Sequence, residues 1–334
     1  MLRCQLVNPV HHDPALLLAL PQTAQRWLLD CGDLHALSLH ELLQIDTVFV
    51  SHAHIDHWIG LDALMRAQLF GDRPLRVLGP KGILEMLAGR LAGYAWNLVS
   101  RSQFVVEGYE WSGSSWESRR FPCCDRFVGQ PSAPGLPGLE NWSLRWVELE
   151  HGVPCLGYRL ESPQAYRFRE ECPFPPGPWI SLLKEKLRRQ ELHGTLLVAG
   201  EQRSISELSQ WVRALPTDQL AYITDTRLDP VTRGRIVEAF GPTRVLWCEA
   251  AFLESQRELA EGKLHSTAAE AALLARELQC ERLQLFHLSR RTQGLADEHL
   301  REARQTFAET YVGQNFEQVQ VLEPAAERKR TETP

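Results

Sequence analysis

The chain has 334 residues, of which 44% are hydrophobic and 23% are charged, with a formal net charge of −6 and a pI near 6.1. This length and hydrophobic content allow an extensive core and suit one large domain or two small ones. The acidic balance excludes a general attraction to nucleic acid, so a polyanionic partner would need a local basic patch.

Residues 1–50 alternate short apolar runs with turns, which predicts the first strands of a sheet. The first residues lack the architecture of a signal peptide, and no apolar run approaches the roughly 20 residues that span a bilayer. The eight cysteines are scattered, and the close pair Cys123-Cys124 is adjacent rather than spaced for a metal. We therefore expect a cytoplasmic protein with reduced cysteines and no membrane partner.

Four side chains able to bind a metal follow the apolar strand predicted at residues 47–50: His52, His54, Asp56 and His57. Two histidines two positions apart point the same way from an extended backbone, and the Asp-His pair turns toward a second position, so the spacing indicates two metals. Imidazole and carboxylate without thiolate favour zinc, with manganese or iron as alternatives. A polar turn would explain one histidine, but it gives no reason for this combination.

The segment after this cluster alternates helices with strands. Apolar spacing predicts a helix at residues 61–70, a short strand within residues 74–82 and a second helix at about residues 83–91. This order indicates α/β layering. Trp111 and Trp116, in the aromatic-rich stretch that follows, are expected in the core rather than on a platform for stacking bases.

Three later predicted strands end at a histidine or an aspartate, namely His151, Asp225 and His287. Between the first two, a Pro/Gly-rich stretch at residues 172–179 leads into a basic helix at residues 182–189, whose cations are of the kind that phosphate contacts require. A surface loop followed by a solvated helix is the plainer interpretation of that stretch.

The ordered motifs resemble those of the metallo-β-lactamase superfamily, and within it the ribonuclease Z family, zinc endonucleases that trim the 3′ trailer from precursor tRNA. The resemblance is carried by His-Ala-His-Ile-Asp-His at 52–57, His151 with Gly157-Tyr158-Arg159, Glu249-Ala250-Ala251-Phe252, Leu264-His265-Ser266-Thr267 and His287-Leu288-Ser289-Arg290. It covers about residues 25–320. It implies the metallo-β-lactamase fold, a four-layer αβ/βα sandwich, over residues 1–323, with a substrate-binding arm inserted at residues 161–195. Residues 324–334 are predicted to be a disordered tail.

The resemblance implies a role for each matching residue. His52, His54 and His151 would bind one zinc, Asp56, His57 and His287 would bind the other, and Asp225 would bridge the two. Asp56 would also orient the attacking hydroxide or take its proton. His265 would donate a proton to the departing ribose oxygen, with Glu249 holding its tautomer. Asp30, in the segment 29–32, would support the site from outside the ligands.

The same resemblance implies how RNA would be held. Arg291 would contact phosphate at the active site. Pro176-Gly177-Pro178 resembles the root of the family's arm, and Lys184 and Arg188 would contact tRNA from this arm. Because dimers of the family use one subunit's arm to hold RNA that is processed at the other's site, a homodimer with precursor tRNA as its partner is expected.

Several positions depart from the family. Residues 7–14 contain neither its Gly-Thr turn nor its Arg-Asn loop that contacts tRNA, and Thr224, Leu264 and Thr292 replace two glycines and a tyrosine. The metal ligands are intact, whereas residues expected to recognise tRNA are altered. Two alternatives therefore stay open: a hydrolase or phosphodiesterase of a small molecule, and a non-catalytic binding protein, which would be expected to lack ligands.

Overall fold

The computed structural model of the protein describes residues 2–313, apart from residues 22 and 140. These residues form two compact units. The first comprises residues 2–138, 144–160 and 219–313, and the second consists mainly of residues 161–218.

One sheet of the first unit has eight described strands that pair in chain order. They are β1 (Arg3–Leu6), β2 (Leu16–Ala19), β3 (Arg26–Leu29), β4 (Ile45–Phe49), β5 (Leu75–Pro80), β6 (Val105–Trp111), β7 (Trp116–Pro122) and β8 (Gln130–Pro131). Strands β3 to β6 are parallel, and the pairs at both edges are antiparallel.

The other sheet of this unit has six described strands in the order β18-β17-β16-β15-β10-β9. They are β9 (Ser143–Glu150), β10 (Pro154–Glu161), β15 (Gln219–Ile223), β16 (Val245–Glu249), β17 (Arg282–Phe286) and β18 (Thr310–Val312). Strands β15 to β18 are parallel. Every residue of β4 and β16 is buried, as is typical of parallel strands covered on both faces.

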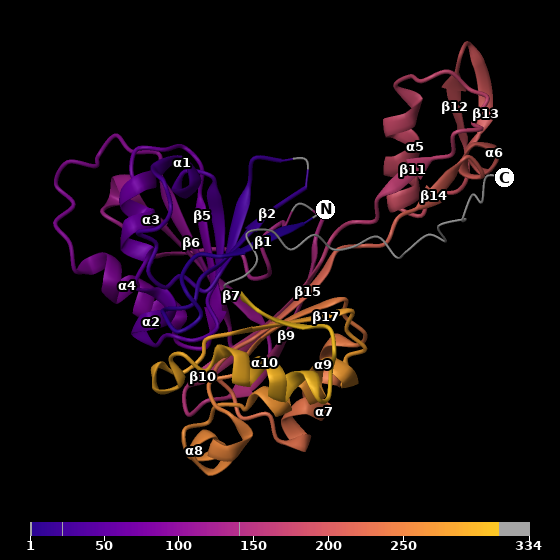
Figure 1. Ribbon diagram of the computed structural model, residues 1–334. Helices are drawn as coiled ribbons and strands as arrows, with labels where there is room; N and C mark the ends of the chain where they lie inside the picture. Colours follow the sequence, from indigo (N-terminus) through magenta and orange to yellow (C-terminus); the bar gives the residue numbers. More distant parts are fainter. Residues whose placement is uncertain (1, 22, 140, 314–334) are drawn as a thin grey trace. The chain divides into compact units, whose positions relative to one another are not determined.

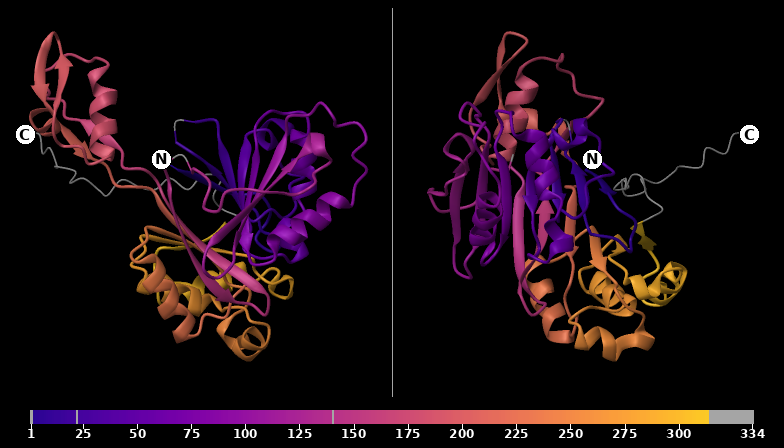
Figure 2. Two further views of the ribbon diagram at one scale, coloured as in Figure 1. Left: turned by 180° about the vertical axis from the view of Figure 1, so that it is seen from behind. Right: turned by 90° about the vertical axis from the view of Figure 1, so that its left-hand side faces the viewer.

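Helices cover the outer face of each sheet. The α-helices described in this unit are α1 (Leu39–Leu42), α2 (Ile55–Trp58), α3 (Leu61–Gln68), α4 (Ile83–Ala92), α7 (Pro230–Phe240), α8 (Arg257–Gly262), α9 (Ala268–Glu277) and α10 (Ala296–Arg304). Its short 3₁₀ helices are η1 (Cys123–Asp125), η2 (Glu254–Gln256) and η3 (Arg290–Thr292). Leu64 of α3 and Leu87 of α4 belong to the core of the first sheet, whereas Ile236 of α7 and Leu274 of α9 belong to that of the second. Figures 1 and 2 show these two helical layers on opposite sides of the paired sheets.

Aromatic side chains fill the space between the two sheets. The ring centroids of Phe49 in β4 and Tyr158 in β10 are 5.6 Å apart. The layers of this unit therefore follow the αβ/βα order expected from the sequence. Because the strands at the centre of both sheets are parallel, their ends concentrate polar side chains at one place: β4 leads to the histidine cluster, β15 to Asp225, and β17 to His287.

The second unit is a small α/β module. Strand β11 (Tyr166–Phe168) pairs antiparallel with β14 (Val212–Ala214), β12 (Thr195–Val198) pairs antiparallel with β13 (Glu201–Ser204), and helices α5 (Trp179–Arg188) and α6 (Ile205–Ser209) complete it. Trp179, Leu183 and Ile205 are buried in its core. The interval expected to form an inserted arm, residues 161–195, falls within this unit, which continues to Asp218.

Other predictions from the sequence have clear outcomes. The helices predicted at residues 61–70 and 83–91 are α3 and α4. Trp116 is buried as expected, whereas Trp111 is partly exposed. All eight cysteines lie within the described residues, and none of them forms a disulfide bond there. No described helix has the length and apolar character needed to cross a membrane. The tail predicted at residues 324–334 lies outside the described residues.

Candidate metal centre

The histidine cluster runs from the end of β4 into α2. The Val50 backbone N–H donates to β5 at 2.7 Å, which keeps the chain extended beyond the strand. His54 is then the N-cap residue of α2, so Asp56 and His57 lie in the first turn of this helix. The change from extended to helical backbone explains why neighbouring side chains of one segment reach two positions.

His52, His54, His151 and Asp225 form the first group of convergent side chains, with donor atoms all within 4.8 Å of one another. Nε2 of His52 and Nδ1 of His54 are 2.9 Å apart. Nε2 of His52 and Nε2 of His151 lie 3.7 and 3.4 Å from Oδ2 of Asp225. Segments far apart in the sequence therefore meet around one small volume.

Asp56, His57 and His287 form the second group, within the same 4.8 Å limit. His57 Nε2 lies 3.7 Å from Asp56 Oδ2 and 3.4 Å from Asp225 Oδ2. His287 Nε2 lies 3.2 Å from Asp225 Oδ1. The structure thus brings together all seven predicted ligands in the two groups expected, with the Asp225 carboxylate between them.

The chemistry of this donor set fits divalent cations. His57 Nε2 is buried and makes no hydrogen bond, although Asp225 Oδ2 is 3.4 Å away. Burial lowers the pKa of His52, and burial raises the pKa of Asp225, which His287 and His57 nevertheless hold well below its usual range. Neutral imidazole and ionised carboxylate are the forms that bind metals. Burial lowers the pKa of His57, but Asp225 and Asp30 raise it by more, so a cation would displace a proton there.

Three residues of the site have left-handed backbone conformations. The φ angles of Asp30, Asp225 and His287 are 57°, 46° and 51°. Each residue lies just beyond the end of a strand, where this conformation turns the side chain off the line of the sheet. Such conformations cost about 1–3 kcal/mol each in residues other than glycine and persist where the surrounding structure fixes them.

Two of the departures noted in the sequence contribute contacts to this site. Thr224 Oγ1 donates to Asp225 Oδ1 at 2.7 Å. Leu264 has a φ of 57°, which glycine adopts without strain, and its carbonyl oxygen lies 3.2 Å from His151 Nδ1. The backbone at Leu264 therefore keeps a conformation favoured by glycine, and its carbonyl fixes the His151 ring so that Nε2 faces Asp225.

His265 and Glu249 form a hydrogen-bonded pair beside the first group. His265 Nδ1 lies 2.8 Å from Glu249 Oε2, and the Thr226 backbone N–H donates to Glu249 Oε1 at 2.7 Å. Burial lowers the pKa of His265, but the Glu249 carboxylate more than offsets it and raises the pKa to about 9. The ring centroids of His265 and His151 are 5.1 Å apart. A proton held on His265 is therefore within the candidate metal centre.

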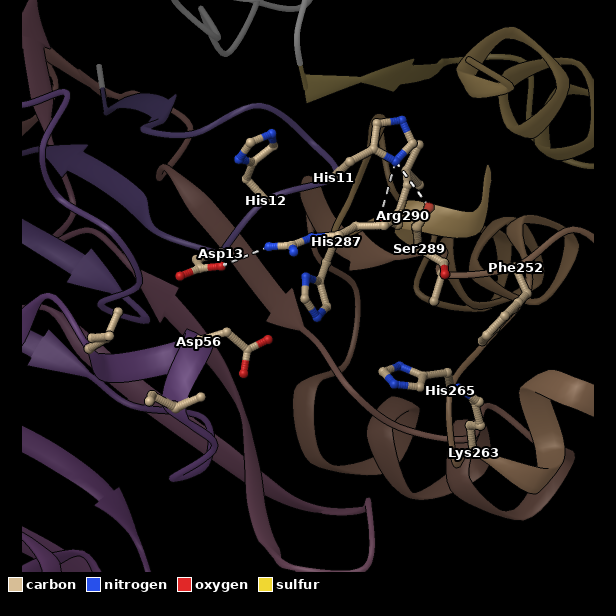
Figure 3. A pocket seen from close by; sticks show the side chains of 14 residues that line it. His11, His12, Asp13, Asp56, Phe252, Lys263, His265, His287, Ser289 and Arg290 are labelled. Atoms are coloured by element: carbon tan, nitrogen blue, oxygen red, sulfur yellow. Dashed lines mark hydrogen bonds and ion pairs between the residues drawn. The ribbon is translucent and has the colours of Figure 1, made fainter. Parts of the chain in front are cut away.

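A pocket of about 460 Å³ opens beside these groups, a volume typical of sites for small ligands. Figure 3 shows Asp56 and His265 on opposite walls, with His287 between them. The lining residues are His11, His12, Asp13, Ile55, Asp56, Ile59, Ala251, Phe252, Lys263, His265, His287, Leu288, Ser289 and Arg290.

Several residues of this pocket were not predicted from the sequence. Lys263 and Arg290 bring positive charge to its wall, and Arg290 Nη2 lies 3.8 Å from Asp13 Oδ1. His11 and His12 come from the loop after β1. The only signal available in the sequence was the run His11-His12-Asp13 at the position where the related family has an RNA-binding loop.

The three residues predicted to contact RNA are not among those that line the pocket. Arg291 is exposed and does not line the pocket, unlike its neighbour Arg290. In the second unit, Lys184 Nζ lies 5.8 Å from the ring centroid of Phe168, and Arg188 Nε donates to the Gln164 carbonyl at 3.1 Å. Both arm residues therefore have contacts within their own unit.

Comparison of the sequence with known proteins shows which proteins it resembles. The chain is 34% identical to the ribonuclease Z of Deinococcus radiodurans over 80% of this chain and 83% of that protein. It is 28% identical to a ribonuclease Z of Bacillus cereus over 88% of each chain. The sequence model of the anti-Pycsar protein Apyc1 matches residues 10–98.

Solved structures confirm the fold. The metallo-β-lactamase-fold protein YhfI of Bacillus subtilis matches with a TM-score of 0.56 at 16% identity, covering 93% of this chain and 95% of that one. The short form of human tRNase Z matches with a TM-score of 0.53 at 16% identity, covering 93% and 96%. The predicted metallo-β-lactamase fold is therefore correct.

Proposed function

The chain belongs to the ribonuclease Z family of metal-dependent hydrolases, and from this we propose that it is a binuclear zinc endonuclease that removes the 3′ trailer of precursor tRNA. The observation that carries the proposal is the convergence of two groups of donor atoms, one on each side of Asp225. A non-catalytic binding protein would not need to keep such a set.

The seven side chains divide naturally between two zinc ions. His52, His54 and His151 would hold one ion, Asp56, His57 and His287 the other, and Asp225 would be shared between the two. When bound, the ions would activate a water for attack and neutralise the charge that builds on the phosphodiester. The same nitrogen and oxygen donors would also accept manganese or iron.

The residues on the two walls of the pocket have complementary roles. The carboxylate of Asp56 is 39% exposed, so it can orient the attacking group and take its proton. His265, on the opposite wall, can donate the proton on Nε2 to the departing ribose oxygen, because Glu249 holds Nδ1 and stabilises the protonated ring. An acid and a base on opposite sides suit displacement at a phosphorus atom between them.

Basic side chains would hold the RNA. Lys263 and Arg290 are placed to contact phosphate in the pocket, and Arg291 would contact it nearby. The second unit would act as the arm, with Lys184 and Arg188 contacting the tRNA backbone. Use of one subunit's arm at the other's site, as in dimers of the family, would make the active form a homodimer, and its expected location is the cytoplasm.

Incubation of the pure protein with a precursor tRNA carrying a 3′ trailer tests the proposal. The wild type loaded with zinc or manganese is expected to release the trailer, and the His54→Ala variant is expected to lose this activity because the first group loses a donor. His40→Ala, which removes an exposed histidine of α1, is the matched control and should cleave normally. Absence of cleavage by the wild type with either metal would remove the RNA claim.

A second candidate function is hydrolysis of a small phosphodiester. The pocket favours it, because a volume of about 460 Å³ suits a small ligand. Turnover of an aryl phosphodiester together with no binding of tRNA at low salt, where phosphate contacts are strongest, would support this function instead.

A further inference from the structure

A single buried carboxylate lies behind both groups of candidate ligands. Asp30, at the end of β3, is fully buried. Its Oδ1 accepts the Ser51 backbone N–H at 2.7 Å. Its Oδ2 lies 2.9 Å from Ser51 Oγ, 2.8 Å from His57 Nδ1 and 2.8 Å from the Tyr222 hydroxyl. Because an ionised carboxylate only accepts hydrogen bonds, all these partners must donate to it.

The first consequence concerns His57, in the second ligand group. Because Nδ1 of His57 keeps its proton for the bond to Asp30, Nε2 is the nitrogen that gives up its proton when a cation binds. That atom is the one that faces Asp56 and Asp225. Asp30 therefore sets both the tautomer and the direction of the His57 ring.

The second consequence concerns His52, in the first ligand group. The one hydroxyl proton of Ser51 is donated to Asp30, so a lone pair of Ser51 Oγ faces His52 Nδ1 at 3.0 Å. Nδ1 of His52 must then carry the proton, which leaves Nε2 to face the other donors of the group. The same carboxylate thus controls one histidine in each group.

Tyr222 is the group that holds this carboxylate from the other sheet. It lies in β15, is fully buried, and donates its hydroxyl to the oxygen that also receives His57 and Ser51. The other described donors to the Asp30 side chain all belong to residues 51–57, the segment that carries four of the candidate ligands. Tyr222 therefore holds the carboxylate from outside this segment.

We infer that Tyr222 is a positioning residue of the metal centre. By fixing the Asp30 carboxylate, it orients His57 directly and His52 through Ser51, so that one hydroxyl group sets the metal affinity of both ligand groups. The inference rests on the proposed metal centre. It goes beyond the ligands themselves, because Tyr222 is not one of the seven candidate ligands.

The structure supplies a matched control in Tyr158. This tyrosine is also fully buried, and its hydroxyl donates to the Val50 carbonyl at 2.7 Å, one residue from Ser51. Its partner is a backbone atom, so loss of this bond should affect stability without reorienting a ligand. Comparison of Tyr158→Phe with Tyr222→Phe separates the cost of losing a buried hydroxyl bond from an effect on the metal centre.

The experiment is a titration of Zn²⁺ into the apo protein against a chromophoric chelator, with thermal unfolding of each apo variant measured alongside. Tyr222→Phe is expected to bind Zn²⁺ about tenfold more weakly than the wild type, the size typical of groups that orient metal ligands. Tyr158→Phe is expected to keep the wild-type affinity, even where its apo stability falls as much. Replacing Tyr222 by p-aminophenylalanine, which keeps a donor, should restore most of the affinity.

A double-mutant cycle tests the route through Asp30. In the Asp30→Asn background, Tyr222→Phe should cause no further loss of affinity, because the contact it removes is already changed. Additive losses, unchanged affinity in Tyr222→Phe, or an equal loss in Tyr158→Phe would each overturn the inference. Should Tyr222→Phe fail to fold, Ser51→Ala takes its place, and an unchanged Zn²⁺ affinity in that variant would overturn the route. A wild type that binds no Zn²⁺ would overturn the metal centre itself.

Discussion

Replacement of Asp225 by asparagine is expected to lower kcat/KM for precursor tRNA by about 10³-fold and to remove most of the bound metal. Asp225 places Oδ1 near His287 and Oδ2 near histidines of both groups, so no other carboxylate of the described site has its position. Asparagine keeps the shape but offers one neutral oxygen and an NH₂ group that would point its protons toward a cation. Cleavage kinetics and metal analysis on the same samples measure both effects.

Asp46→Asn is the control for the loss of a buried carboxylate. Asp46 lies in β4, the strand that leads into the histidine cluster, and its side chain accepts a hydrogen bond from Thr47 rather than approaching the ligands. This variant should retain metal and activity. If Asp225→Asn cleaved tRNA at the wild-type rate with its metal retained, Asp225 could not be the bridging group.

Replacement of His265 by alanine is expected to lower kcat for precursor tRNA by about 10²-fold while the metal content stays unchanged. The reason is that a ribose oxygen is a poor leaving group without a proton, and His265, paired with Glu249, is placed to supply one. An aryl phosphodiester has a leaving group that departs without protonation, so its turnover should fall far less. The ratio of the two losses measures the acid role directly.

Glu249→Gln tests the partner of this histidine. The variant should lose activity against tRNA less severely than His265→Ala, and the double variant should be no worse than His265→Ala alone, because the two residues act as a unit. If His265→Ala lowered the turnover of precursor tRNA and of the aryl phosphodiester equally, this result would contradict the acid role of His265. Loss of metal in His265→Ala would instead identify the residue as a ligand, since its donor atom lies within 4.8 Å of those of Asp225 and Glu249.

Much of the site could be predicted because it lies at strand ends. A strand is recognisable from its apolar pattern, and the residue that follows a parallel strand is committed to one edge of the sheet. The short spacing of the histidine cluster indicates its four members from local sequence alone. His151, Asp225 and His287 each follow a predicted strand, but a single residue at a strand end carries little weight, and it is the resemblance to the ribonuclease Z family that identifies these three as ligands.

The contacts that could not be predicted join segments with no shared pattern. Tyr222 and Asp30 are 192 positions apart and belong to different sheets, so only packing of the two sheets brings them together. The pocket wall depends on loops at residues 11–13 and 288–290, whose paths follow no periodicity. For the same reason the sequence resemblance predicts a phosphate contact for Arg291, whereas its neighbour Arg290 is the residue that lines the pocket.

Zinc-edge anomalous diffraction from crystals grown with Zn²⁺ tests the two-metal centre most directly. Two peaks are expected, one among His52, His54 and His151 and the other among Asp56, His57 and His287, with Asp225 in contact with both. A single peak, or zinc bound away from these side chains, would contradict the proposal that this chain assembles a two-metal hydrolytic site.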